Sequence, residues 1–161
     1  MPVNANVSFQ VDHRIAVGAI VEDEGRVLLV RHFRPGRYDF WVAPGGAVQG
    51  SEELAAAVVR EVREECGLAV EPGRVAYIEE LFNPDMRQVK FWFTARLLGG
   101  VLSTLAAEAQ SEHIVEAAWL SREELRGRTV FPPVLAASYW QDRDSGFSAP
   151  VHLGLRRMGF W

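Results

Sequence analysis

The chain contains 161 residues, of which 48% are hydrophobic and 24% charged, a composition typical of one ordinary globular domain. Its formal net charge of −4, from 17 basic and 21 acidic residues, disfavours stable binding to nucleic acid or to an acidic membrane surface. The single cysteine, Cys66, excludes an internal disulfide and a cysteine-based zinc site, so we expect it to fill a packing position.

No targeting or membrane segment is recognisable in the sequence. The start of the chain has no basic segment followed by an apolar run, and no stretch approaches the roughly 18 consecutive apolar residues of a membrane span. We therefore expect a cytoplasmic protein.

The first half of the chain alternates between apolar segments and turn residues. The expected strands are residues 14–21, 26–31 and 41–42. Turn residues 23–25 join the first two strands as a hairpin, and a polar loop at residues 34–37 precedes the third. After the double glycine at residues 45–46, a helix is expected from Ser51, a favourable N-cap, to Gly67, which suits a helix C-terminus.

The second half predicts further strands and two more helices. The expected strands are residues 74–81, 89–98 and 114–120. Residues 83–85 form the turn between the first two, and residues 99–113 are expected to be a loop. Residues 121–124 have the sequence of a capping box at the start of a short helix, and residues 131–141 predict the last long helix. The tail, residues 142–161, allows no assignment. This order predicts a mixed sheet with helices on both sides.

The first expected helix carries acidic residues at the border of its apolar stripe. At about 100° of rotation per residue, one arc contains the apolar residues Leu54, Ala55, Val58, Val59 and Val62. Glu61 and Glu65 fall at the margin of that arc, and with Glu64 they lie within one sector of roughly 100°. Like charges four residues apart destabilise an isolated helix by about 0.2–0.5 kcal/mol. The carboxylates therefore form either a solvated acidic face, with Arg60 paired to Glu64, or the ligands of a cation.

The context of these carboxylates favours a metal site. Mg²⁺ binds oxygen ligands, and one or two carboxylates together with substrate phosphates suffice for each ion. The glycine turn before the helix allows a backbone carbonyl to come close to the same ion. Such an ion polarises a phosphoryl oxygen and lowers the pKa of a bound water, and a remaining carboxylate can act as general base. The residues predict metal-assisted hydrolysis of a phosphorylated substrate.

Residues 46–68 resemble the signature of the Nudix hydrolase family, G-x5-E-x7-R-E-U-x-E-E-x-G-U, in which U is aliphatic. All fixed and aliphatic positions are present at the required spacing, namely Gly46, Glu52, Arg60, Glu61, Val62, Glu64, Glu65, Gly67 and Leu68. The flanking segments extend the resemblance over about residues 14–140. It implies a Nudix-type α/β/α sandwich with a mixed β-sheet, formed by a single domain.

The resemblance also implies the activity. Members cleave the pyrophosphate linkage of nucleoside diphosphate derivatives by water attack at phosphorus, with Mg²⁺ or Mn²⁺. The implied metal ligands are Glu61, Glu64, Glu65 and the carbonyl of Gly45. Arg60 orients the glutamates, and the implied supporting residues are Gly46, Glu52 and Gly67. The general base is one of the glutamates of the helix or comes from a later loop. Our candidate in that loop is Glu112, with Glu108 and Glu116 behind it.

Substrate contacts are less well determined. Arg14 and Arg34 could bind phosphates, and Phe82 or Trp92 could stack on a base, although surface and core roles respectively remain the alternatives. Two features bear on the substrate, and they conflict. Pro84 lies 16 residues after the signature, as in some ADP-ribose hydrolases, whereas residues 41–46 are closer to nucleoside-triphosphate-cleaving members. A homodimer is compatible with the resemblance, and so is a sensor that binds a nucleotide without hydrolysing it.

Overall fold

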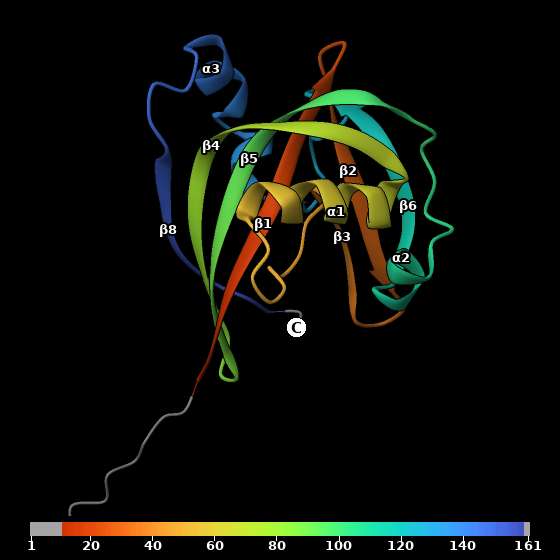
Figure 1. The fold of residues 1–161 in the computed structure, drawn as a ribbon, viewed down its shortest axis with the longest axis vertical. Helices are drawn as coiled ribbons and strands as arrows, with labels where there is room; N and C mark the ends of the chain where they lie inside the picture. The colour runs from red at the N-terminus through yellow and green to blue at the C-terminus, as the bar shows by residue number, and fades with distance from the viewer. Residues whose placement is uncertain (1–10, 160–161) are drawn as a thin grey trace, which may run out of the picture.

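The structure, a computed structural model, describes residues 11–159 of the chain (Figure 1). The strands are β1 (Asp12–Asp23), β2 (Arg26–Arg34), β3 (Tyr38–Val42), β4 (Leu68–Phe82), β5 (Met86–Gly100), β6 (Ile114–Ser121), β7 (Val130–Phe131) and β8 (Val151–Arg157). The helices are α1 (Leu54–Cys66), α2 (Ala107–Ser111), α3 (Tyr139–Asp144) and the 3₁₀ helix η1 (Pro133–Ala136). None of the helices in the described part of the chain has the length and apolar character that a bilayer crossing requires.

The strands divide into two groups that meet at the turn between β1 and β2. One group has the order β1-β5-β4-β8, with parallel pairing of β1 with β5 and of β4 with β8. In the other group β2 pairs with β3 on one side and β6 on the other, and β7 pairs with β3. The two groups lie side by side in Figure 1, with α1 crossing in front of them. This arrangement leaves a space between the two groups beyond the β1–β2 turn.

The predicted hairpin is present only at its closed end. β1 pairs with β2 at Glu22↔Val27 and Asp23↔Arg26, whereas residues 12–21 pair with β5. The reason is that β3 and β6 occupy both edges of β2. The free edge of β1 instead receives the double-glycine segment. Ala19 and Val17 donate their N–H groups to the carbonyls of Pro44 and Gly46, at 2.8 and 2.9 Å. The glycine turn is therefore fixed directly against the sheet.

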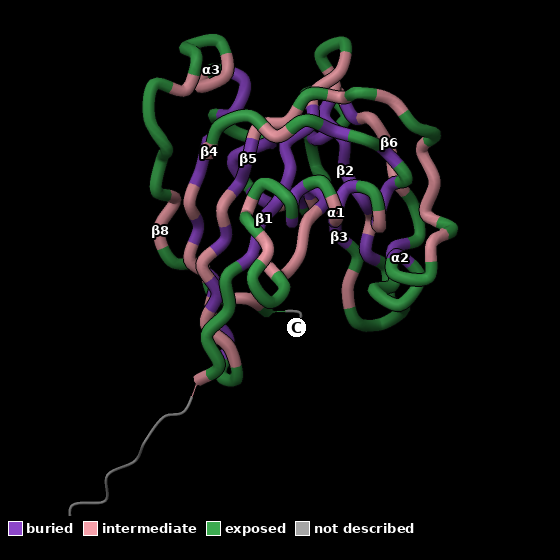
Figure 2. The backbone as a smooth tube through the Cα atoms, viewed as in Figure 1, coloured by how far each residue is buried: buried purple, intermediate pink, exposed green. Residues whose placement is uncertain are grey.

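Two apolar clusters hold the layers together. One lies under α1 and includes Val17, Leu28 and Val62, all at most 1% exposed. The other lies on the opposite side, where Trp92 belongs to one cluster with Leu135 of η1 and Tyr139 of α3. Figure 2 shows buried residues along the central strands and on the inner side of α1. Full burial of an aliphatic side chain contributes about 1.5–3 kcal/mol, so the two clusters stabilise the sandwich from both faces. The predicted α/β/α arrangement with a mixed sheet is confirmed.

The expected start of the first helix was wrong. The helix begins at Leu54, after Glu53, and Ser51 lies in the preceding turn. Glu52 closes that turn, since its N–H donates to the carbonyl of Gln49 at 3.0 Å and its carboxylate accepts from the Gln49 N–H at 2.7 Å. The predicted end was correct. Gly67 has φ of 71°, a left-handed conformation that favours glycine, and its N–H donates to the carbonyl of Arg63 at 3.0 Å.

Other expectations failed where proline or glycine interrupts a pattern. The single helix over residues 131–141 is instead β7, η1 and α3, because Phe131 pairs with Val42 and two prolines follow it. Ser121 and Glu124 make the contacts of a capping box, but turns follow and no helix forms before Gly127, whose φ is 76°. The expected loop at residues 99–113 contains α2, and the unassigned tail contains β8.

Candidate active site

The helix α1 turns two of the signature glutamates into the protein. Glu61 and Glu65 are only 5% and 2% exposed, although a carboxylate is among the groups least often buried. The buried face of α1 is rotated relative to the arc expected from the sequence, since Ala57 is fully buried whereas Ala55 is exposed. Glu61 and Glu65 therefore lie within the buried face and not at its margin. Glu64 is half-buried and lies beside them.

The double-glycine turn is shaped by the same carboxylates. A Cβ on Gly46 would lie 2.6 Å from Oε1 of Glu61, so only glycine allows that carboxylate to approach the turn. The N–H of Gly45 donates to Oε2 of Glu65 at 3.1 Å. The carbonyls of Pro44 and Gly46 accept from β1, while that of Gly45 accepts no hydrogen bond from the described residues. The predicted ligand atom at Gly45 is thus uncommitted within residues 11–159.

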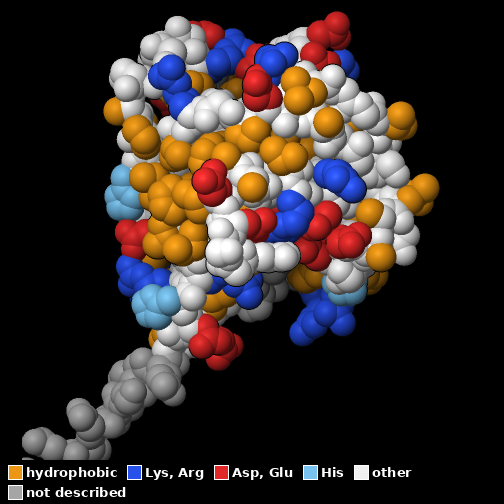
Figure 3. All heavy atoms as spheres, viewed as in Figure 1, with side chains coloured by type: hydrophobic (Ala, Val, Ile, Leu, Met, Phe, Trp, Pro, Cys, Tyr) orange, Lys and Arg blue, Asp and Glu red, His pale blue; other side chains and the backbone are white. Residues whose placement is uncertain are grey.

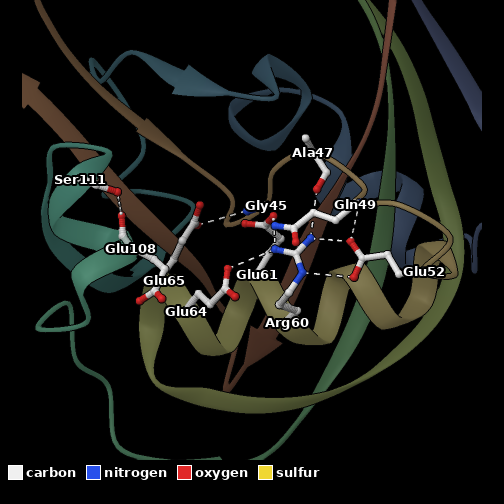
Figure 4. A network of polar contacts seen from close by, with 10 residues as sticks. All are labelled: Gly45, Ala47, Gln49, Glu52, Arg60, Glu61, Glu64, Glu65, Glu108 and Ser111. Carbon is white, nitrogen blue, oxygen red and sulfur yellow. Dashed lines mark hydrogen bonds and ion pairs between the residues drawn. The ribbon is translucent and has the colours of Figure 1, made fainter.

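Arg60 organises the carboxylates on its side of the helix (Figure 4). Its guanidinium donates to both oxygens of Glu52, at 2.6 and 3.1 Å, to Glu61 at 2.7 Å and to Glu64 at 3.1 Å. A further bond of 3.0 Å goes to the carbonyl of Ala47. This multiple pairing uses the fork geometry of arginine, which lysine lacks. The orienting role of Arg60 and the supporting role of Glu52 stay predictions, and these contacts are the geometry that such roles require.

Burial and mutual repulsion shift the acidity of the cluster. Burial raises the pKa of Glu61, against the opposing effect of Arg60, and burial together with Glu112 and Glu61 raises the pKa of Glu65 well above its usual value. Burial and the charge of Glu61 also raise the pKa of Glu112. The hydrogen bonds to Arg60 lower the pKa of Glu52. The charge of the buried Lys90 opposes the shift at all three groups, yet their pKa values stay raised, so a further cation would stabilise their charged forms.

The later loop brings Glu112 to the cluster. Glu112 follows α2 and contacts the same cleft as Glu61, Glu64 and Glu108. Its backbone is fixed to β2, because Nδ1 of the buried His32 lies 3.0 Å from its carbonyl oxygen. The third candidate of this loop, Glu116, lies away from the cluster, 3.6 Å from the guanidinium of Arg31 on β2. Figure 3 shows acidic side chains gathered around basic ones on the face of the molecule that carries α1.

A cleft of about 600 Å³ extends from this acidic end between the two groups of strands. Of the predicted substrate contacts, Arg14 and Trp92 line it, whereas Arg34 and Phe82 do not. Trp92 is 1% exposed and donates from its indole N–H to Glu79 at 3.1 Å, so it belongs to the floor of the cleft. Sequence reasoning missed Lys90, whose charge acts on Glu61 and Glu65 from within the cleft. It also missed the residues at the far end, which come from separate segments: Tyr38, Phe40, Gln88, Phe131 and Arg156.

The chemistry of the donors fits a divalent metal ion. Glu61, Glu64 and Glu65 each use one oxygen for a protein hydrogen bond, and the second oxygen accepts none from the described residues. No buried side-chain oxygen in residues 11–159 lacks a partner, so these second oxygens keep some exposure, and Glu61 and Glu64 line the cleft. In this arrangement, with Arg60 bound to two of the carboxylates, no three candidate ligands of the described chain converge on one point. The ligand atoms available here are nevertheless carboxylate and carbonyl oxygens, the type that Mg²⁺ and Mn²⁺ bind.

Comparison with known proteins identifies relatives of the chain. The NUDIX domain family model matches residues 12–139. The human 8-oxo-dGDP phosphatase NUDT18 is 33% identical over 144 residues, which cover 86% of this chain but 43% of that protein. A MutT-like protein of Streptomyces ambofaciens is 30% identical over 72% of this chain and 69% of its own length. The chain thus spans less than half of the human relative.

Solved structures show the same fold. The crystal structure of a NUDIX hydrolase from Nitrosomonas europaea superposes with a TM-score of 0.74 over 92% of this chain and 81% of that one, at 22% identity. The MutT protein from Methanosarcina mazei has a TM-score of 0.67 and 25% identity, over 85% of this chain and 98% of that one. The mixed sheet with its crossing helix is therefore an arrangement that this chain shares with solved NUDIX proteins.

Proposed function

The chain belongs to the Nudix hydrolase family, and from this premise we propose that it hydrolyses the pyrophosphate linkage of a nucleoside diphosphate derivative with Mg²⁺ or Mn²⁺. The observation that supports this proposal is the burial of Glu61 at one end of a cleft that Glu64 and Glu112 also line, with the buried Glu65 one turn further along α1. Buried carboxylates in such numbers are unfavourable unless a cation compensates them. A structural acidic face would place them in water.

Each residue has a proposed task. Glu61, Glu64, Glu65 and the carbonyl of Gly45 would hold the metal, and Arg60 keeps the glutamates in place through four hydrogen bonds to carboxylate oxygens. When bound, a divalent ion polarises the phosphoryl group and lowers the pKa of a coordinated water. Glu112 is our candidate for the general base, since a raised pKa suits a group that must accept a proton near neutral pH. Glu61 and Glu64 are the alternatives for that role.

The substrate class is suggested by the human relative. That protein is named an 8-oxo-dGDP phosphatase, and the aligned part covers 86% of this chain. We therefore place oxidised and unmodified guanine nucleotides first among the candidate substrates. ADP-ribose comes second, because its support is the position of Pro84 alone. Nucleoside triphosphates and dinucleoside polyphosphates complete the panel.

A metal-dependent screen over this panel tests the function. The expected result is release of phosphate or a nucleoside monophosphate with Mg²⁺ or Mn²⁺, lost on addition of a chelator and restored by excess metal. Tight binding of a nucleotide without product in any metal would identify a sensor and overturn the proposal. Release of product that persists in chelator would overturn the metal site while leaving a hydrolase.

A further inference from the structure

One wall of the cleft is formed by a row of residues that the sheet register brings together, and it runs to the far end of the cleft. Arg14 on β1 pairs with Gln88 on β5, Gln88 with Leu81 on β4, and Leu81 with Arg156 on β8. Directly paired residues point to the same face of a sheet, and all four line the cleft. The C-terminal strand therefore contributes a cation, Arg156, opposite the acidic end.

Arg156 is held in a fixed plane. Its Nε donates to Oε1 of Glu79 at 2.7 Å, and its guanidinium carbon lies 4.2 Å from the centre of the Phe131 ring on β7. Glu79 is itself buried, with a side chain 3% exposed, and its second oxygen accepts from the Trp92 indole at 3.1 Å. The described residues offer the two Nη groups of Arg156 no hydrogen-bond partner. A stacked guanidinium with free terminal donors is ready to bind a ligand.

The surroundings of these donors select the shape and polarity of the ligand. Tyr38 and Phe131 form an aromatic wall on either side of Phe40, with ring centres 5.5 and 5.4 Å from that of Phe40. Phe40 itself is 1% exposed and stacked on His32, so it supports the wall from behind. Such a wall favours a planar ring over a phosphate group. Both oxygens of Glu79 are already used, whereas the guanidinium of Arg156 is a donor. The ligand must therefore present hydrogen-bond acceptors at this end.

We propose that Arg156 recognises the base of the substrate and that this base is a 6-oxopurine, as in guanine or hypoxanthine, rather than adenine. The proposal rests on the nucleotide hydrolysis proposed above. The carbonyl oxygen at C6 accepts from the guanidinium, and N7 beside it provides a second acceptor in unmodified guanine. Adenine presents an amino group at the same position, so two donors would face each other. Arg156 is thus a residue that determines specificity, supplied by a strand outside the signature.

The test compares catalytic efficiency on GDP, IDP and ADP. For the unchanged protein we expect similar kcat/KM values for GDP and IDP, and a value about 10- to 100-fold lower for ADP, the discrimination that a good arginine–base contact provides. Arg156→Gln should lower the values for GDP and IDP by about the same factor and leave ADP nearly unchanged. Arg156→Lys should resemble Arg156→Gln, because lysine keeps the charge but loses the planar fork.

Arg157→Gln is the matched control. Arg157 is the next residue of β8, lies over Phe82 with 5.5 Å between its guanidinium carbon and the ring centre, and does not line the cleft. Its substitution should leave the ratio of GDP to ADP unchanged, and thermal melting should establish that all variants are folded. An equal loss on all three nucleotides in Arg156→Gln, restored in Arg156→Lys, would indicate a phosphate contact and overturn the proposal. The proposal is also overturned if the unchanged protein shows no preference for GDP over ADP.

Equilibrium binding separates this proposal from the proposed function. GMP and AMP are titrated into the protein without metal, and GMP should bind more tightly in the unchanged protein but not in Arg156→Gln. If no nucleotide is hydrolysed while GMP retains this preference, the function fails and the base site stands. If nucleotides are hydrolysed without this preference, the base site fails and the function stands.

Discussion

The two ends of the cleft are built in different ways. The acidic end comes from one contiguous segment, in which α1 and the turn before it hold Glu61, Glu64 and Glu65 against Gly45 and Gly46. The far end takes its residues from five strands: β3, β4, β5, β7 and β8. A short local segment thus determines the reactive groups, whereas the whole fold determines what lies opposite them. Changes at the acidic end should therefore affect turnover, and changes under the far end should affect stability and substrate choice.

The largest expected effect is at the acidic end. Glu64→Gln and Glu65→Gln should each lower turnover by about 10²- to 10⁴-fold, the range that loss of a catalytic carboxylate typically produces. Thermal melting without metal should show no loss of stability for Glu65→Gln, because burial raises the pKa of Glu65 and its charge is unfavourable in the folded state. The measurements are kcat at saturating Mg²⁺ and the melting temperature in chelator.

Glu53→Gln is the control for this pair. Glu53 is exposed and immediately precedes α1, so its substitution removes one negative charge near the cluster without touching the site. We expect its turnover to equal that of the unchanged protein. Wild-type turnover in Glu64→Gln or Glu65→Gln would remove the basis for placing the reaction at this end of the cleft.

The same contrast explains how much could be predicted from the sequence. The spacing of Gly46, Arg60 and Glu65 and the helix end at Gly67 depend on neighbours within about two dozen residues, and the structure places them as the pattern predicts. The rotation of the buried face of α1 was not predictable, because burial of Ala57 depends on the strand beneath it. Cys66 fills a packing position, as expected.

The far end could not be predicted for the same physical reason. Arg156 lies in a tail with no clear periodicity, and its role arises from the parallel pairing of β8 with β4 and from its contact with Phe131. The register of strands separated by more than 70 residues leaves no local signal. The pattern of residues 89–98 did indicate a strand, but not that Gln88, Lys90 and Trp92 on one face of β5 line a cleft.

A smaller effect is expected where the second strand group supports the acidic end. His32 is 3% exposed, and burial lowers its pKa to about 4 from 6.5. As pH falls below 6.5 the unfolded chain binds a proton before the folded one, so stability decreases until pH reaches the folded pKa. The total loss is roughly 3 kcal/mol, from 1.36 kcal/mol per pKa unit. His32→Asn keeps a donor near the Glu112 carbonyl and should remove this loss.

Denaturant unfolding at pH 7, 5.5 and 4.5 measures this loss of stability. The quantity compared is the free energy of unfolding of the unchanged protein minus that of His32→Asn at each pH. The contribution of the clustered carboxylates to the pH dependence is common to both proteins, so it cancels in this difference. His13→Asn, on the exposed start of β1, is the control and should leave the pH dependence unchanged. A pH dependence that is the same in His32→Asn and in the unchanged protein would show that His32 is not the buried neutral group described above.

The smallest effect is expected beneath the far end. Tyr77 on β4 is fully buried opposite Trp92, and its hydroxyl donates to Asp142 of α3 at 2.7 Å. Tyr77→Phe keeps the ring and removes this one bond, so unfolding free energy should fall by about 1–2 kcal/mol. Ser138→Ala removes an exposed bond of 3.0 Å to the same carboxylate oxygen and should change stability by less than about 0.5 kcal/mol. In both variants kcat should stay as in the unchanged protein, because neither bond reaches α1. A loss of turnover in Tyr77→Phe that matches its loss of stability would mean that the two ends are coupled, and that the acidic end is less self-contained than its contiguous sequence indicates.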